Sequence, residues 1–449
     1  MLTFGQPLGR GLGVLLFSGV VAGFAGALFR SMPRSVQGPM IAGVVAVMIA
    51  GVFQELIQAM LPYTGALGAV HQFVYVWEGL TPAGAGILFV LAAVIEPAWH
   101  GARRRVAHPT DDQLRRQRML RAGSALIALA IMPALAGNYI GQVLMLVGLY
   151  ILMGMGLNLE VGLAGLLDLG FVAFFAVGAY TTALLTADSP HALLHLSFWL
   201  AMPASVALAV VVGVIFGLPV LGVRGDYLAV ATMGLGEIVR IIVLSDFAAP
   251  LLGGAQGVLQ IPKPSLGVTV LSSPVQLFYL TLVASAVAAF VAWRLENSRL
   301  GRAWMALRDD EDVAQALGIN LVRSKLMAYG LGAAFAGLAG SIFAVMLTSV
   351  YPSSFQLLIS INVLALIIVG GMGSLPGVVL GSIALIGLPE LLREFGEYRY
   401  LFYGAVLIVM MQWRPEGLWP SEVRRRELHE AEEIEAGEEA AELIPVQPR

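Results

Sequence analysis

The sequence has no cysteine, and only two of its 449 residues are lysine. Without cysteine, the chain has no disulfide framework, no cysteine-ligated metal and no thiol chemistry. A nucleotide-binding loop of the form G-x-x-x-x-G-K-[ST] needs a lysine followed by Ser or Thr. Lys263 and Lys325 are followed by Pro264 and Leu326 instead. The chain therefore cannot bind a nucleotide by that device.

Motifs for enzymatic chemistry are also missing. The six histidines show no metal-binding spacing such as H-E-x-x-H, and no nucleophile elbow G-x-S-x-G occurs. We therefore predict no catalytic residue, no metal ligand and no cofactor in this chain, and we expect that it is not an enzyme.

Charged residues are scarce. They make up 12% of the chain, against about 25% in a typical soluble domain, while 58% of the residues are hydrophobic and the mean hydropathy is +0.83. Four long runs contain no Asp, Glu, Lys or Arg: 122–159, 189–223, 264–293 and 326–389. About 20 apolar residues span a bilayer as a helix, so the longest runs must hold several spans. The composition predicts an all-α integral membrane protein that crosses the bilayer many times.

The few basic residues are segregated along the chain. Seven arginines lie in 97–121, six basic residues lie in 294–325, and Arg424, Arg425 and Arg426 follow the last apolar run. The segments 61–82 and 188–196 contain none, and 246–274 has only Lys263. Cytoplasmic loops of membrane proteins are enriched in Lys and Arg. The arginine-bearing segments and the C-terminus are therefore expected in the cytoplasm.

This orientation gives a consistent path of about 13 membrane segments, some of which can be re-entrant. Three are expected in the N-terminal region, near 11–29, 40–61 and 83–96, and about ten in the core. The core segments are two within 122–158, then 163–185, 197–220, 227–245, 276–293, 326–349, 358–371, 376–392 and 400–412. Glycines at four-residue spacing, as in Gly373, Gly377 and Gly381, predict close helix packing, which we favour over a ligand role.

The segment "GRAWMALRDDEDVAQALGIN", Gly301 to Asn320, is a polar region between two apolar runs. Asp309 or Asp310 is a good N-cap and Gly318 suits the position after a helix end, so a short helix is predicted near 311–317. Acidic residues at its start also suit the helix dipole. The local pattern fits both an ordinary solvated loop helix and a docking element for a soluble partner.

Polar residues also interrupt the apolar runs. Asn158, Glu160 and Asp168 lie in a glycine-rich stretch, where transporters place broken helices along a pathway. The alternative is a helix boundary with snorkelling side chains, and Asp168 is favoured over Glu160 as a pathway residue. Glu237 and Arg240 share one helical face, which fits either a pathway role or an internal ion pair.

Two further segments have no assigned activity. "LLGGAQGVLQIPKP", Leu251 to Pro264, is predicted to be an ordered outer loop that either meets an extracytoplasmic partner or merely connects two spans. The segment 427–442 contains eight glutamates, and this composition is typical of a solvated helix or a disordered tail.

The ordered series of motifs resembles the bacterial branched-chain amino-acid ABC importer permeases of the LivM type. The motifs are "MGLNLEVGLAGLLDLGFVAFFAVGAY", "VRGDYLAVATMGLGEIVRI", "GGAQGVLQIPKP", "LGRAWMALRDDEDVAQALGIN", "FAGLAGSIFA", "VGGMGSLPGVVLG" and "WRPEGLWP". The resemblance covers about 121–420. It implies a polytopic helical permease with a core at 122–412 and a cytoplasmic coupling loop at 294–325. The acidic tail at 413–449, expected in the cytoplasm, is not accounted for by the resemblance. N-terminal helices at 1–96 and an Arg-rich loop at 97–121 resemble an extension of some members.

The resemblance also implies function and partners. Such a permease imports leucine, isoleucine and valine across the bacterial inner membrane. It pairs with a homologous LivH-type permease, with two LivG- and LivF-type ATPases that bind ATP-Mg, and with a periplasmic binding protein; no nucleic acid is involved. Residues that match the ATPase-coupling helix of the family are Arg308, Asp309, Asp310, Glu311, Ala314, Ala316 and Gly318. Polar stations for a zwitterion could be Asn158, Asp168, Asp226 and Glu237.

Alternatives remain open at this point. The same architecture serves urea, short amides and other amino acids in related permeases. A stand-alone secondary transporter or channel would have inverted repeats and no docking helix, and no clear repeat is present. An integral-membrane enzyme would need His or acidic residues clustered near one membrane face. Outside the tail and 301–320, no such cluster occurs.

Overall fold

The structure is a computed structural model of the whole chain, and it describes residues 137–391 apart from 224 and 268. It also describes 39–40, 43, 46–47, 50, 74–76, 79–81, 83–93, 133, 393 and some residues of 401–420. The chain separates into two compact units, Met1–Leu129 and Ala130–Arg449.

The first unit contains the short strands β1 (Tyr75–Val76) and β2 (Gly79–Leu80), which pair antiparallel. They precede an apolar helix at Ala83–Ala93, within the segment expected near 83–96. The helix expected at 11–29, the arginine-rich loop and the acidic tail after residue 420 lie outside the described residues. Of the helix expected at 40–61, only isolated residues are described.

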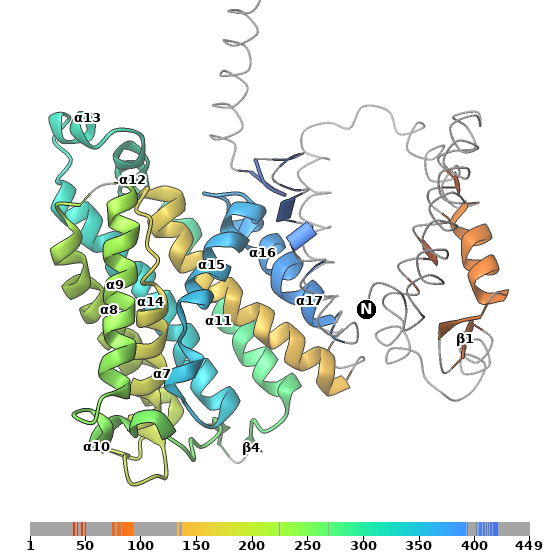
Figure 1. Cartoon of the computed structure of the whole chain (residues 1–449), viewed down its shortest axis with the longest axis horizontal. Coiled ribbons are helices and arrows are strands. Elements are labelled where there is room, and N and C mark those ends of the chain that lie inside the picture. The colour runs from red at the N-terminus through yellow and green to blue at the C-terminus, as the bar shows by residue number, and fades with distance from the viewer. Residues whose placement is uncertain are drawn as a thin grey trace, which may run out of the picture. The chain divides into compact units, whose positions relative to one another are not determined.

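The second unit is a bundle of apolar helices, labelled in Figure 1. A first helix at Gly137–Leu163 ends in the π-helix η1 (Asn158–Leu163). It is followed by α7 (Val172–Thr186), α8 (Phe198–Val220), α9 (Asp226–Leu244), α11 (Pro274–Glu296), α14 (Leu321–Leu347), α15 (Leu357–Gly370) and α16 (Leu375–Ser382). The π-helix η4 (Ile383–Gly387) and α17 (Leu388–Leu391) continue α16. Within the described residues, six helices are long and apolar enough to cross a membrane.

Shorter elements connect these helices. They are α10 (Ala249–Leu252), η2 (Gly254–Gln256), β3 (Ser265–Leu266), β4 (Thr269–Val270), α12 (Arg299–Asp309), α13 (Glu311–Ala316) and η3 (Pro352–Ser354). β3 and β4 pair antiparallel. Within the described residues, the named strands form two short pairs, β1–β2 and β3–β4. All other named elements there are helices, in agreement with the expected all-α membrane class.

Local signals define the helix ends. At the start of α11, the Ser273 hydroxyl accepts from the Gln276 amide at 3.4 Å and the Gln276 side chain accepts from the Ser273 amide at 3.1 Å. This reciprocal pair is a capping box. Asn320 caps α14 by accepting from the Arg323 amide at 2.9 Å, and α14 ends at Thr348 with φ +58°.

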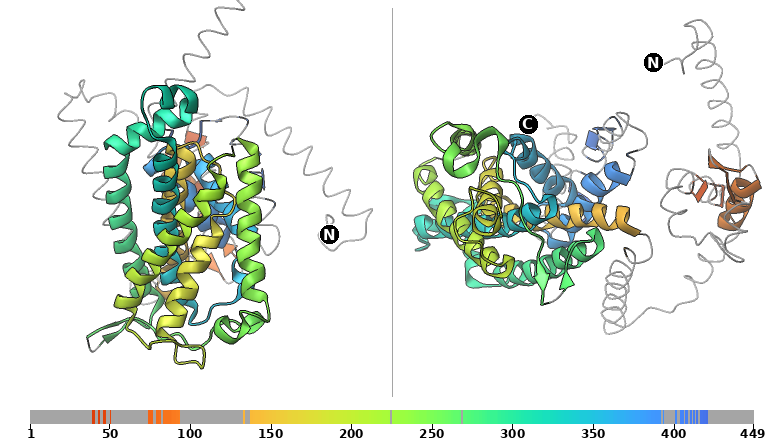
Figure 2. Two further views of the ribbon diagram at one scale, coloured as in Figure 1. Left: turned by 90° about the vertical axis from the view of Figure 1, so that its left-hand side faces the viewer. Right: turned by 90° about the horizontal axis from the view of Figure 1, so that it is seen from below.

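Helix α14 is the centre of the unit and packs against both α7 and α8 (Figure 2). Small residues allow the backbones to approach closely. A methyl group at Gly178 of α7 would meet the backbone of Gly337 on α14, and one at Gly340 would meet the Phe175 carbonyl. A larger side chain at either glycine would therefore force α14 and α7 apart.

The glycine spacing in 373–381 is a packing signal only in part. Gly377 and Gly381 of α16 lie against the backbone of α15 near Gly370 and Leu366, so close packing is confirmed there. Gly373 lies instead in the turn between these helices, where its φ is +76°. The spacing rule failed at Gly373 because the helix begins only at Leu375.

Several helix boundaries differ from the expectation. The span predicted to begin at 326 begins five residues earlier, at Leu321. The span predicted to begin at 163 begins at Val172, because 164–171 is not helical and Gly165 has φ +71°. The helix expected only near 311–317 is preceded by a second one, α12. This amphipathic helix was missed because its buried residues Trp304 and Leu307 are few among charged neighbours. The first of the two spans expected in 122–158 lies almost wholly outside the described residues.

The bundle has two distinct ends (Figure 1). Helices α12 and α13 project from one end, while α10 and β4 lie at the other. Basic residues near the α12–α13 end are Arg299, Arg302, Arg308, Arg323 and Lys325. The loops 187–197, 245–273 and 348–356 at the other end contain one Arg or Lys among their described residues, Lys263. The charge asymmetry of the sequence thus separates the two ends of the fold.

Candidate functional site

Helices α12 and α13 form a compact unit, here called the projecting unit (Arg299–Ala316). Ser298 caps α12 by accepting from the amides of Leu300 and Gly301, at 3.1 and 3.3 Å. Asp310 ends α12 and caps α13, because its carboxylate accepts from the amides of Asp312 and Val313 at 2.8 and 2.9 Å. These caps satisfy amides that have no partner inside a helix. The helix predicted near 311–317 is therefore confirmed, with Asp310 as its N-cap.

A buried ion pair connects the projecting unit to α14. The Lys325 ammonium lies 2.7 Å from a carboxylate oxygen of Glu311, and their side chains are 4% and 20% exposed. Trp304 is fully buried, and its indole N–H donates to the Ser324 carbonyl at 2.9 Å. Both contacts reach the first turn of α14, so the projecting unit and the start of α14 are joined by polar contacts as well as by the chain.

A third contact reaches η1. The Arg308 guanidinium donates to the Gly162 carbonyl at 3.1 Å, across 146 residues of sequence. Gly165 lies directly under Arg308, since a methyl group on Gly165 would come within 2.8 Å of the Arg308 side chain. The predicted coupling residue Arg308 is therefore a bridge to the π-helix.

The remaining coupling-helix residues differ in position. Asp309 is exposed and lies 3.5 Å from the Arg308 guanidinium. Ala314 is buried within the projecting unit, whereas Ala316 is exposed. Gly318 has φ +87°, a left-handed conformation that suits glycine at a helix end. Two apolar side chains point outward on α13: Val313 is 55% exposed and Leu317, just after the helix, is 77% exposed.

The second polar region lies at η1 and the segment 164–171, here called the junction. Every residue of η1 is buried. The Asn158 side-chain oxygen accepts from the Gly373 amide at 2.8 Å, so the π-helix is tied to the turn between α15 and α16. π-Helical turns often occur at functional sites.

Two carboxylates are buried at the junction. Glu160 and Asp168 are 0% and 1% exposed, and each carboxyl group lies within electrostatic reach of the other. Asp168 accepts from the Gly170 amide at 2.7 Å. Thr232 of α9 joins α9 to the junction by accepting from the Leu169 amide at 3.0 Å. The sequence analysis favoured Asp168 over Glu160 as a pathway residue, whereas in the structure both lie at the junction.

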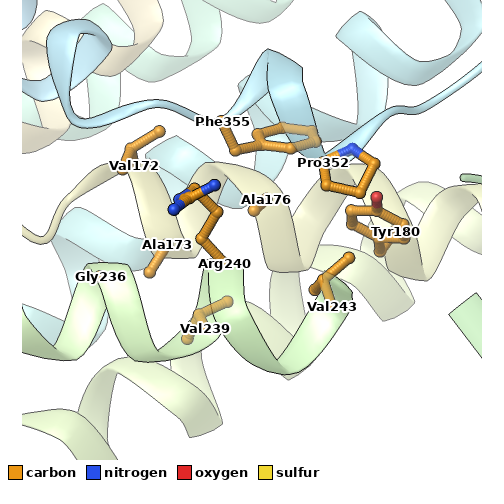
Figure 3. A pocket seen from close by; sticks show the side chains of 10 residues that line it. All are labelled: Val172, Ala173, Ala176, Tyr180, Gly236, Val239, Arg240, Val243, Pro352 and Phe355. Atoms are coloured by element: carbon orange, nitrogen blue, oxygen red, sulfur yellow. The ribbon is translucent and has the colours of Figure 1, made fainter. Parts of the chain in front are cut away.

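Glu237 and Arg240 form a separate pair on α9. The Arg240 Nε atom lies 2.9 and 3.0 Å from the two carboxylate oxygens of Glu237, and both side chains are partly exposed. Figure 3 shows Arg240 beside α7 and Phe355, where it lines a cavity of about 10 Å³. The internal ion pair that the spacing allowed is therefore formed.

The four predicted pathway residues are not gathered into one site. Asn158 and Asp168 both lie at the junction, and Glu237 forms its own pair farther along α9. Asp226 is the first residue of α9, and its side chain is not among the described ones.

Sequence reasoning did not select Lys325, Thr232 or Tyr329. The rarity of lysine was the available signal for Lys325, whereas the tertiary neighbours of Thr232 and Tyr329 have no local signature.

No group of three or more His, Cys, Asp and Glu residues that could hold a metal ion is found in the described part of the chain.

Comparisons with known proteins agree with this architecture. Residues 139–411 match the family model for the permease component of branched-chain amino acid transport systems. The high-affinity branched-chain amino acid permease protein LivM of Escherichia coli is 34% identical over 86% of this chain and 95% of its own length. Its Salmonella typhimurium counterpart is 37% identical over 75% of this chain and 84% of its own.

The more distant permease protein LivH of Escherichia coli is 23% identical over 60% of this chain and 90% of its own length. No solved structure matches the chain.

A bundle of membrane-length helices with a polar projecting unit, together with these matches, defines a membrane permease. The chain belongs to the family of permease components of branched-chain amino-acid transport systems, and it crosses the membrane several times.

Proposed function

We propose that this chain is the transmembrane permease subunit of an ATP-driven importer, which carries leucine, isoleucine and valine from the periplasm to the cytoplasm. The observation that carries the coupling mechanism is the projecting unit. Its tip presents exposed apolar side chains, and its base is bonded to α14 and η1. The family description and the names of the relatives support the substrate class.

The proposed orientation follows from charge. Basic residues gather at the end of the bundle that carries α12 and α13, and cytoplasmic loops are enriched in such residues. The projecting unit then faces the cytoplasm of a bacterial cell from its inner membrane. The segment 417–420 supports a cytoplasmic C-terminus, because Trp419 donates from its amide to the Gly370 carbonyl near the same end.

ATP is bound and hydrolysed on separate subunits in this proposal. The chain lacks the lysine-containing phosphate loop, and two ATPases of the LivG and LivF type would supply it together with ATP-Mg. Val313 and Leu317 would be buried in a groove of an ATPase. An apolar side chain contributes about 1.5–3 kcal/mol when it is fully buried, so these two residues are suitable anchors for docking.

Motion of the ATPase would reach the membrane through the base of the projecting unit. The Glu311–Lys325 ion pair and the Trp304 hydrogen bond act on the first turn of α14, and Arg308 acts on η1. A displacement of α13 would therefore displace both α14 and the helix that ends in η1. ATP shifts the permease between states only if the ATPase binds the projecting unit better in one of them.

A second permease of the LivH type would complete the pathway, and a periplasmic binding protein would meet the end formed by 187–197, 245–273 and 348–356. The chain and the LivH relative share one ancestry over most of the LivH length, which fits a heterodimer of homologous subunits. A pathway role for Asn158, Asp168, Asp226 and Glu237 stays a prediction.

Substitution Leu317→Asp tests the docking role. It places a charge on the proposed contact without removing any bond at the base of the projecting unit. We expect uptake of labelled leucine by the reconstituted complex to fall about tenfold or more, as the loss of 1.5–3 kcal/mol of contact energy requires. The ATPases should also co-purify less well with the permease.

The matched control is Leu193→Asp, since Leu193 is also an exposed leucine, 56% against 77% for Leu317, and lies at the opposite end. It should leave the co-purified amount of ATPase unchanged. Normal uptake and normal ATPase recovery in the Leu317→Asp complex would contradict the proposed docking role.

The substrate assignment is tested separately by competition. Unlabelled isoleucine and valine should inhibit uptake of labelled leucine, while urea and acetamide should not. Inhibition by urea, with none by isoleucine, would replace the proposed substrate by an amide.

A further inference from the structure

The junction contains a group of buried oxygen atoms that the proposed coupling mechanism does not use. Glu160, Asp168 and Tyr329 come from η1, the segment after it and α14, and each is at most 2% exposed. Both carboxylate oxygens of Glu160, Oδ2 of Asp168 and the Tyr329 hydroxyl have no hydrogen-bond partner. Buried polar groups are normally paired, so each unpaired group in a native fold requires an explanation.

The paired atoms around them are already in use. Asp168 Oδ1 accepts from the Gly170 amide at 2.7 Å. Thr232 Oγ1 accepts from the Leu169 amide at 3.0 Å and donates to the Ala229 carbonyl at 3.1 Å. The Gly170 amide and the Thr232 hydroxyl therefore have no donor left for the unpaired carboxylate oxygens, and the Tyr329 hydroxyl can donate to at most one of them.

A small cavity lies beside Asp168 and Tyr329. Its volume is about 10 Å³, and its other lining residues are Gly170, Phe174, Phe216, Thr232 and Leu235, whereas Glu160 lies outside this lining. A space of this size admits a single particle as large as a water molecule. It excludes an amino acid in the conformation described here.

The neighbouring basic side chains are committed elsewhere. On α14, Lys325 is one turn before Tyr329, but its ammonium pairs with Glu311. Arg308 of α12 donates to the Gly162 carbonyl, and Arg240 of α9 pairs with Glu237. No salt bridge to Glu160 or Asp168 is formed within the described residues. Two carboxylates that are removed from water need a compensating positive charge.

The backbone of α14 is adapted to the Glu160 carboxylate. A methyl group at Gly332 would overlap Oε1 of Glu160. Glycine at this position leaves room for the carboxylate to lie against the helix, one turn beyond Tyr329. The carboxylate position is thus built into the packing of η1 on α14.

We propose that Glu160, Asp168 and Tyr329 form a site for one sodium ion. Sodium has about the size of a water molecule and binds oxygen atoms. A divalent cation fits less well, because Ca²⁺ takes six to eight oxygen ligands and Mg²⁺ keeps several waters. The bound cation joins η1 to α14 at the level where α9 also packs.

Thermal unfolding of the purified full-length chain in detergent tests this site without reference to transport. Sodium chloride is exchanged for choline chloride at constant ionic strength, and the series is repeated at several pH values. A ligand at one hundred times its Kd should raise the melting temperature of a chain of this length by roughly 3 °C. Stabilisation by sodium at constant pH supports the site, whereas stabilisation by acid alone, equal in both salts, reports protonation of a carboxylate and counts against it.

The variants Glu160→Gln and Asp168→Asn should lose this response, and Tyr329→Phe should weaken it. Glu160→Gln should also be at least as stable as the unsubstituted chain in choline chloride, because the neutral amide needs no counter-charge. Glu237→Gln is the matched control, since that carboxylate has its own partner, and it should keep the full response. The proposal is overturned if sodium does not stabilise the chain relative to choline at any pH, or if the response persists in both Glu160→Gln and Asp168→Asn.

Discussion

Carboxylates occur in two regions of this permease under opposite conditions. In the projecting unit, Asp310 caps a helix and Glu311 is paired with a lysine 2.7 Å away. At the junction, Glu160 and Asp168 are buried against each other and retain three oxygen atoms without a partner. The same side-chain chemistry therefore stabilises one region by itself, whereas it leaves the other in need of a positive charge.

The two regions therefore suit different roles in the proposed mechanism. The projecting unit, whose polar contacts are satisfied, moves as a body and acts on α14 and η1 through those contacts. A junction with unsatisfied charge responds to the ions around it, because a bound ion changes its stability. The two regions meet at Arg308, which extends from α12 to the carbonyl of Gly162 in η1.

The largest expected effect comes from reversing the charge of Lys325. Lys325→Glu places a second carboxylate beside Glu311 at a buried position, and breaking a buried ion pair costs about 3–5 kcal/mol. We expect leucine uptake by the reconstituted complex to be abolished, and the melting temperature of the permease to fall. The double variant Glu311→Lys with Lys325→Glu restores opposite charges and should recover a measurable part of both. Failure of the double variant to recover either quantity would remove the ion pair from the coupling mechanism.

The next prediction compares the two regions directly through neutral substitutions. Glu311→Gln removes the partner of Lys325 and should destabilise the permease by about 1–3 kcal/mol, because a buried donor loses its charged acceptor. Glu160→Gln removes one of two facing carboxylates and should not destabilise it in sodium-free medium. The melting temperatures of the two variants, measured in the same sodium-free medium, test this difference. Equal destabilisation by both substitutions would contradict the claim that only Glu311 is stabilised by a charged partner.

Much of the projecting unit could be predicted from the sequence, because its signals are local. Asp310 and Gly318 mark the ends of α13, and the acidic residues between them distinguish it from the apolar spans. The boundaries of α8, α9 and α11 lie within about three residues of the predicted spans, since long uncharged runs define them. Helix α12 was missed because amphipathic helices of this length have only a few buried residues.

The junction could not be predicted in the same way. Asp168 was selected for its place in an apolar stretch, but its contact with Glu160 depends on the chain turning through Gly165. Tyr329 and Gly332 reach the site only through the packing of α14 on η1. Such contacts join residues more than 150 positions apart, and no short sequence pattern encodes them.

A smaller effect is expected from the N-cap of α13. Asp310→Ala removes the acceptor for two backbone amides, and the loss of such a cap costs about 1 kcal/mol. Asp310→Asn keeps an acceptor oxygen and should retain most of the stability. Circular dichroism with thermal unfolding of the purified chain checks both. If the asparagine variant is as unstable as the alanine variant, the charge rather than the hydrogen bond stabilises this end.

The central claim is that the tip of α13 touches an ATPase subunit. The absence of cysteine from the chain allows a direct measurement, since Leu317→Cys introduces a single thiol at an exposed position. A photoreactive maleimide attached there, in membranes that contain the co-expressed ATPases, should yield a covalent adduct of permease and ATPase. The same label at Leu193→Cys, at the opposite end of the bundle, should yield none. An adduct with the ATPase from Leu193→Cys, with none from Leu317→Cys, would contradict this account.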